Sequence, residues 1–214
     1  MRPSTHSSFL SRPYFIQWPS LIVLALFLNP CRAKSQVPRP IVATTGSTFL
    51  GYDGNWSPVS IRVGTPQQYL SLLPSTLSQE TWVVGPAGCD GTSACTNKRG
   101  GLFSANKSFT FQERGLYELD SQDASSGYYG IDTIDLNDDI STADQIIALV
   151  NSTEHWIGNL GLGVQQTRFD GTENFLPLLS SLVQHGSFIP SHSYGYTAGA
   201  FYRMLRLFPP TLQF

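Results

Sequence analysis

The amino-acid sequence predicts an all-β domain, a barrel or sandwich with one short helix. Three observations support this fold class. Short runs of alternating apolar and polar residues recur along the chain, 19 glycines and 14 prolines separate many of those runs, and a single segment has the apolar spacing of a helix. The chain has 214 residues, of which 41% are hydrophobic, and this is enough apolar material for the core of one domain.

Residues 59–63 form the clearest predicted strand. Apolar valine and isoleucine residues alternate there with Ser60 and Arg62, which is the period of two expected of a strand with one buried face. A Gly-Thr-Pro turn signal follows at residues 64–66. Further strands are predicted at residues 69–73, 81–84, 109–112, 131–136, 145–150 and 156–162.

The predicted helix occupies residues 175–183. Apolar residues recur there at the spacing of one helix face, namely Phe175, Leu178, Leu179, Leu182 and Val183. Gly186 stands where a C-terminal helix cap belongs. We therefore expect this segment to pack as an amphipathic helix against the strands.

The amino terminus has the order of a secretory signal. Arg2 and Arg12 precede an apolar run over residues 21–28, and Ala33 is a small residue where cleavage would occur. The run is shorter than the roughly 20 residues that span a bilayer. We therefore expect residues 1–33 to be removed, which leaves a secreted, extracellular chain with no membrane span. The alternative is an uncleaved signal anchor that tethers the chain to a membrane.

Two cysteines remain after removal of the signal, because the third lies within it. In an oxidising compartment, an even pair close in sequence predicts one disulfide, here between Cys89 and Cys95. The alternatives are two free thiols and a zinc site, for which two further ligands at suitable spacing are missing. Three Asn-x-Ser/Thr sequons agree with secretion, and we expect a glycoprotein modified at Asn55, Asn106 and Asn151.

The charge pattern argues against a nucleic-acid partner. The formal net charge is −2 at pH 7, and no basic cluster occurs. The aspartates between residues 132 and 144 do not form an EF-hand loop, so a solvated acidic hairpin is the favoured interpretation. His185 and His192 are not spaced as metal ligands. We predict no cofactor and no metal.

Several motifs occur in the order in which pepsin-like aspartic peptidases carry them. Residues 63–68, Val-Gly-Thr-Pro-Gln-Gln, resemble the opening hairpin of that family, Ile/Val-Gly-Thr-Pro-x-Gln. The family order continues with Trp82-Val83, the cysteine pair, and residues 130–134, 156–163 and 193–196. The resemblance covers about residues 52–202, which corresponds to the amino-terminal lobe, and it is greatest to a fungal group of the family.

In that family each lobe supplies one aspartate of a catalytic pair, within an Asp-Thr-Gly-Ser motif. An ungapped count places Ser75-Thr76-Leu77-Ser78 at this motif. A serine hydroxyl carries no charge at accessible pH and cannot replace an ionised carboxylate, and Leu77 replaces a glycine. No Asp-Thr-Gly or Asp-Ser-Gly occurs in the sequence. The resemblance thus implies no catalytic residue and leaves Ser75, Thr76 and Ser78 to line a binding groove.

Other catalytic roles have less support. The groove-covering hairpin of the family carries a tyrosine, and packing within the sheet is the favoured role of each candidate, namely Tyr117, Tyr128 and Tyr129. A nucleophilic Ser75 would need a histidine nearby, and no Gly-x-Ser-x-Gly motif surrounds it.

The predicted organisation has four parts, with the second lobe absent: a signal at 1–33, an extended lead-in at 34–51, the lobe at 52–202 and an irregular apolar tail at 203–214. The leading hypothesis is a secreted, inactive lobe that binds extended peptide or protein. One alternative is an aspartic endopeptidase that acts only with a partner lobe, and another is a truncated, non-functional gene product. An uncovered inter-lobe face would favour self-association.

Overall fold

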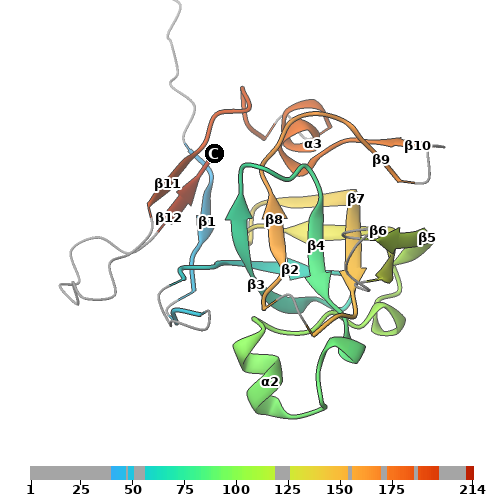
Figure 1. Cartoon of the computed structure of the whole chain (residues 1–214). Coiled ribbons are helices and arrows are strands. Elements are labelled where there is room, and N and C mark those ends of the chain that lie inside the picture. Colours follow the sequence, from blue (N-terminus) through green and yellow to red (C-terminus); the bar gives the residue numbers. More distant parts are fainter. Residues whose placement is uncertain are drawn as a thin grey trace, which may run out of the picture. The chain divides into compact units, whose positions relative to one another are not determined.

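The computed structural model of the chain describes residues 40–46, 48–50, 56–118, 126–153, 156–169, 173–185, 188–197 and 211–214 (Figure 1). These residues belong to one unit that spans Pro38–Phe214. The predicted signal at residues 1–33 and the sequon at Asn55 lie outside the described residues.

Seven strands form the main sheet, in the order β2-β3-β8-β4-β7-β6-β5. Their bounds are β2 Val59–Val63, β3 Gln68–Ser75, β4 Thr81–Val84, β5 Gln112–Glu118, β6 Ser126–Asp135, β7 Ser141–Val150 and β8 Asn159–Gly161. Strand β2 also pairs with β6, where Val63 lies opposite Ile134, so six strands close into a barrel that β5 flanks. The predicted all-β fold is confirmed.

The apolar positions of the alternating strands fill the barrel interior. Burial alternates residue by residue along β2, where Val59, Ile61 and Val63 are at most 2% exposed. Leu70 and Leu72 of the neighbouring strand β3 belong to the same core cluster. The predicted period of two therefore marks the inner face of this hairpin and places its polar side chains on the outer face.

Two predicted strands overlap only partly with the strands of the structure, since most of their predicted residues lie outside β5 and β8. Residues 109–111 lie outside strand β5, because the Phe109 N–H donates to the carbonyl oxygen of Thr65 at 2.7 Å instead of joining the sheet ladder. The segment predicted at residues 156–162 contributes only Asn159–Gly161 to a strand. The other predicted strands overlap β2, β3, β4, β6 and β7.

Two α-helices occur in the described residues, α2 Ser93–Lys98 and α3 Leu178–Gln184, so the prediction of a single helix is wrong. Helix α3 overlaps the predicted amphipathic segment at residues 178–183 and packs on the core, whereas Phe175, also predicted on the helix face, belongs to a strand, β10 Glu173–Phe175. Helix α2 buries no residue and has no apolar stripe; its first turn is capped by the Thr92 hydroxyl, which accepts a hydrogen bond from the Cys95 N–H at 3.1 Å. Short 3-10 turns occur at Pro86–Gly88 and Ala105–Lys107.

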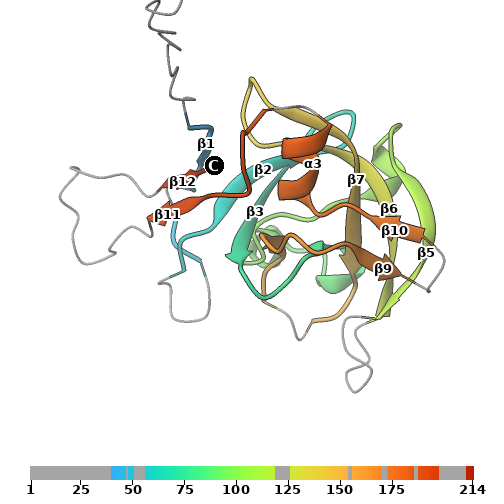
Figure 2. The same ribbon diagram turned by 90° about the horizontal axis from the view of Figure 1, so that it is seen from above.

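A second sheet has the order β1-β12-β11, with β1 at Val42–Thr44, β12 at Thr211–Gln213 and β11 at Gly195–Thr197 (Figure 2). Ala43 and Leu212 are fully buried and belong to the same core cluster as the barrel residues. The predicted boundary of the lobe at residue 52 therefore lies inside the folded unit, because part of the predicted lead-in is a buried strand.

The prediction of an irregular tail at residues 203–214 is wrong for residues 211–213, which form strand β12. Residues 211–213 pair with strands on both sides, and Phe214 exchanges backbone hydrogen bonds with Ile41. Three residues are too few to reveal a period of two, so no local pattern predicts this strand. A small hairpin of β9 Thr167–Phe169 and β10 Glu173–Phe175 completes the described strands. Within the described residues, no helix combines the length and hydropathy needed to cross a membrane.

Candidate functional site

The candidate site is the loop at residues 75–78, which begins at Ser75, the last residue of strand β3. Strand β8 lies between β3 and β4 in the sheet, so the chain that leaves β3 must pass the end of β8 before it enters β4 (Figure 1). Ser75 is paired in parallel with Gly161. Thr76 and Leu77 are exposed, and the loop thus projects from a sheet that holds both of its ends.

The segment after β8 fastens this loop through its backbone. The Leu162 N–H donates to the carbonyl oxygen of Ser75 at 2.9 Å, and the Gly163 N–H donates to that of Ser78 at 2.9 Å. At Gly161, an added Cβ would stand 2.5 Å from the carbonyl oxygen of Glu80. This close approach needs a residue without a side chain, so the glycines of residues 156–163 define the shape of the loop.

The side chains of the loop bond locally. The Ser75 hydroxyl accepts a hydrogen bond from the Leu77 N–H at 3.3 Å. The Ser78 hydroxyl lies 2.9 Å from the carbonyl oxygen of Glu80 and 3.1 Å from its carboxylate Oε2. Leu77, at the tip, is 92% exposed. Over residues 75–80 the sole ionisable side chain is that of Glu80, and it contacts Ser78 rather than Ser75.

Two of the three tyrosine candidates, Tyr128 and Tyr129, pack within the sheet, and the side chain of Tyr117 lies outside the described part of the structure. Tyr129 is 2% exposed, and its ring meets that of Phe175 edge to face at 6.0 Å between centroids. Tyr128 is half-buried and meets Phe111 edge to face at 6.1 Å. Burial, and after it the charge of Glu113, raises the pKa of Tyr128. Both contacts agree with the favoured packing role.

A buried polar network at the opposite end of strand β3 was not expected from the sequence. Asp132 and Asp135 are 2% and 6% exposed, so the prediction of a solvated acidic hairpin is wrong for these two residues. Asp132 Oδ1 accepts hydrogen bonds from the Thr110 hydroxyl at 2.5 Å and from the Thr133 N–H at 2.8 Å. Asp135 Oδ2 accepts one from Gln67 Nε2 at 2.6 Å. Their neighbours Asp138, Asp139 and Asp144 are exposed, as predicted.

The predicted disulfide between Cys89 and Cys95 is confirmed. The guanidinium of Arg99 is buried beside it and donates to the carbonyl oxygens of Gly88 and, at 2.8 Å, of Ser152. This burial lowers the pKa of Arg99. The Thr92 hydroxyl and N–H both donate to Asp90, which lowers the pKa of that carboxyl group. The disulfide loop is therefore a structural unit with its polar groups bonded internally.

The remaining predicted residues lie apart from the loop. Asn106 is exposed, whereas Asn151 is half-buried against Gly85, so Asn106 is the more accessible of the two described sequons. His192 Nε2 lies 3.3 Å from the hydroxyl of Ser180, a buried residue of α3, and not beside Ser75. Among the described residues, no three His, Cys, Asp or Glu side chains gather as metal ligands would.

Comparisons with known proteins agree with this geometry. The family model of eukaryotic aspartyl proteases matches residues 58–195, which is more than half of the chain. The chain therefore belongs to the eukaryotic aspartyl protease family, and the predicted resemblance is confirmed. A curated relative is the secreted aspartic protease 7 of Candida albicans, which is 28% identical over 131 residues. That match covers 56% of this chain and 22% of the relative, so the chain spans about a fifth of the relative's length.

Proposed function

We propose that this chain is a secreted aspartyl-protease lobe that does not hydrolyse peptides and instead binds extended polypeptide. One observation carries the proposal. Ser75 ends strand β3 at the place where the family resemblance puts the catalytic aspartate, and its hydroxyl is bonded to the Leu77 N–H of its own loop.

The chemistry of the loop supports inactivity. Peptide hydrolysis in this family needs water held between two carboxylates that share one proton. Ser75 supplies no carboxylate, and the nearest acid along the loop, Glu80, is hydrogen-bonded to Ser78. The lobe thus contributes neither the ionised base nor its protonated partner at the loop.

Binding of an extended peptide requires backbone groups rather than an aspartate. Strand β5 ends the main sheet and pairs only with β6 among the described strands, so its other edge has free N–H and C=O groups. Leu116 on this strand is 83% exposed and offers apolar contact area. An added peptide strand would satisfy the edge groups of β5, which is a common mode of peptide recognition. Secretion is supported by the amino-terminal signal pattern at residues 1–33.

The test is an assay of the purified mature chain on an acid-denatured protein substrate, with and without pepstatin. We expect no cleavage at any acid pH, together with measurable binding of unfolded substrate. Pepstatin-sensitive cleavage would contradict the proposal and would favour the alternative in which two copies or a partner lobe bring two carboxylates together. Expression of the whole chain in a fungal host tests secretion: the protein should reach the medium without residues 1–33.

A variant with a restored motif tests whether the absence of an aspartate at position 75 is by itself the cause of inactivity, or whether a second carboxylate is also needed. Ser75→Asp combined with Leu77→Gly restores Asp-Thr-Gly-Ser at residues 75–78. If this variant cleaves the substrate and the parent chain does not, Ser75 is the cause of the inactivity. We expect no cleavage by the monomeric variant, because a single lobe still presents only one carboxylate.

A further inference from the structure

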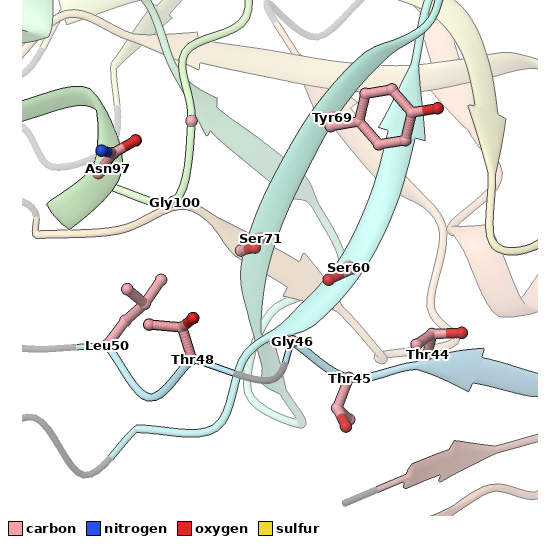
Figure 3. Close-up of a pocket in the computed structure, with 11 residues that line it drawn as sticks. Thr44, Thr45, Gly46, Thr48, Leu50, Ser60, Tyr69, Ser71, Asn97 and Gly100 are labelled. Atoms are coloured by element: carbon pink, nitrogen blue, oxygen red, sulfur yellow. The ribbon is translucent and has the colours of Figure 1, made fainter. Parts of the chain in front are cut away.

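A groove of about 740 Å³ runs along the outer face of the β2–β3 hairpin (Figure 3). Its floor carries Ser60 from β2 and Tyr69 and Ser71 from β3. One wall comes from residues 44–46, Thr48 and Leu50, and the other from Asn97 at the end of helix α2 and from residues 100–101. The volume lies within the range of about 300–1,000 Å³ that is usual for ligand pockets. No residue of the 75–78 loop lines it.

The strand pattern builds the floor of this groove. Because Val59, Ile61 and Val63 point into the barrel, the polar residues between them point outward. Ser60 lies directly opposite Ser71 in the sheet register. The side chains of the floor are therefore held by a hairpin whose other face is part of the core.

Gly100 positions the second wall. Its φ of +72° is rare for other residues, and an added Cβ would collide with the carbonyl oxygen of Ser71. The Ser71 N–H donates to the carbonyl oxygen of Gly100 at 2.7 Å, which fixes this wall to the floor. The end of helix α2, with Asn97, thus stands beside strand β3 (Figure 3).

Four polar side chains of the groove, three on its floor and one on a wall, are available to a ligand. Within the part of the chain that the structure describes, the side chains of Ser60, Tyr69, Ser71 and Asn97 donate to and accept from no other protein group. The Tyr69 side chain is 74% exposed, so a large part of its ring is open to solvent. The lining contains hydroxyl, amide and backbone groups and no charged side chain.

We propose that this groove binds a neutral oligosaccharide. A sugar ring has an apolar C–H face, which stacks favourably on the electron-rich face of an aromatic ring such as Tyr69. Its hydroxyls both donate and accept, as do those of Ser60 and Ser71 and the amide of Asn97. A charged ligand would find no counter-charge in the lining, and a purely apolar ligand would leave the polar groups desolvated and unpaired.

The charged side chains nearest the groove lie in an adjoining hollow. This hollow of about 180 Å³ shares Tyr69 with the groove and includes Arg62, Asp135 and Asp138. Arg62 and Asp138 form an ion pair at 2.5 Å, and Asp135 accepts a hydrogen bond from Gln67. The lining of the groove itself carries no charged side chain, and the site is independent of the proposed peptide-binding function.

The test uses the mature, enzymatically deglycosylated chain and isothermal titration with soluble hexasaccharides. The neutral probes are laminarihexaose, cellohexaose, chitohexaose and a mannohexaose, and the acidic probe is hexagalacturonate. We expect at least one neutral probe to bind and hexagalacturonate not to bind. Tyr69→Ala should weaken binding about tenfold or more, the scale of an aromatic hot spot. Asn97→Ala, on the opposite wall, should weaken it by about threefold or more, as loss of one neutral hydrogen bond would.

The matched control is Tyr194→Ala, since Tyr194 is also an exposed tyrosine and does not line the groove. Its affinity for the neutral probe should equal that of the parent chain, and thermal unfolding should confirm that all three variants are folded. Absence of binding by every neutral probe at millimolar concentration would overturn the proposal. Equal affinity of the Tyr69→Ala variant and the parent, or tighter binding of hexagalacturonate, would also overturn it.

Discussion

The two ends of strand β3 differ in the acidic residues that lie beside them. At the end where the strand begins, the buried carboxylates Asp132 and Asp135 are hydrogen-bonded to Thr110, Thr133 and Gln67. At the end where the strand finishes stands Ser75, which the sequence comparison predicts at the place of the family's aspartate, and the loop is held there by backbone hydrogen bonds. Buried carboxyl groups thus occur at the beginning of the strand, and residues 75–78 contain none.

The difference shows which part of the structure depends on buried carboxyl groups and which part does not. Burial of a carboxyl group costs free energy that its hydrogen bonds offset; Oδ1 of Asp132 accepts two, from Thr110 and Thr133, and Oδ2 accepts none among the described residues. The 75–78 loop needs no such group to hold its shape, because the Leu162 and Gly163 N–H groups bond to it directly. The architecture around the loop therefore depends on backbone hydrogen bonds and not on a buried carboxyl group.

The largest expected effect is at the beginning of the strand. Asp132→Ala removes a buried acceptor that binds both the Thr110 hydroxyl and the Thr133 N–H, so we expect the free energy of unfolding to fall by about 3 kcal/mol. Urea unfolding followed by tryptophan fluorescence measures this change. Asp138→Ala is the control: its side chain is 92% exposed in a surface ion pair, and its loss should cost less than about 1 kcal/mol. Equal effects of the two variants would refute the assigned role of the network.

A second prediction addresses the support of the loop. Gly161→Ala would place a methyl group 2.5 Å from the carbonyl oxygen of Glu80 and force the loop to move, which should cost about 2 kcal/mol. Gly195→Ala is the matched control, because an added Cβ there meets no atom within 4 Å, and its effect should stay within about 0.5 kcal/mol. Similar stability of both variants would show that β8 does not constrain the loop.

A smaller effect is expected from the hydroxyl that bonds to Asp132. Thr110→Val keeps the shape of the side chain and removes the donor to Asp132 Oδ1, so we expect a loss of about 1.5 kcal/mol. The double variant Asp132→Ala/Thr110→Val should lose less than the sum of the single variants, since both remove the same hydrogen bond. Strict additivity in a double-mutant cycle would contradict this coupling.

The smallest effect on stability is expected at the tip of the loop. Leu77 is 92% exposed, so Leu77→Ser should change the free energy of unfolding by less than about 0.5 kcal/mol. If the exposed leucine contributes to self-association, the same change should raise the monomer fraction in sedimentation velocity at a given concentration. An unchanged distribution of species would remove Leu77 from any association surface.

Local patterns in the sequence were sufficient for much of the fold. The alternation over residues 59–63 gives strand β2 because each apolar position gains burial in the barrel, and the apolar face over residues 178–182 gives helix α3 for the same reason. Helix α2 and strand β12 could not be predicted in this way. Helix α2 depends on the Thr92 cap, and β12 depends on strands distant in the sequence.

The candidate site was predictable only in part. Counting from a recognised motif placed Ser75 at the loop, and the pairing of Ser75 with Gly161 supports that placement. The burial of Asp132 had no local signal, because its donor Thr110 lies on a segment distant from it in the sequence. The groove beside Tyr69 is also assembled from three distant segments, so exposure and missing hydrogen-bond partners become visible only in three dimensions.

The position of strand β12 has a consequence for assembly during synthesis. Its pairing of Thr211 with Thr44 joins residues far apart in sequence, and closing so long a loop is entropically unfavourable until other contacts have formed. The strands of the barrel are translated before β12, so the barrel can form while the chain is still on the ribosome. Strand β1 can pair with β12 only after residues 211–213 have been translated. Slow translation after residue 197 would therefore prolong the time for which β1 and β11 offer open edges to other chains.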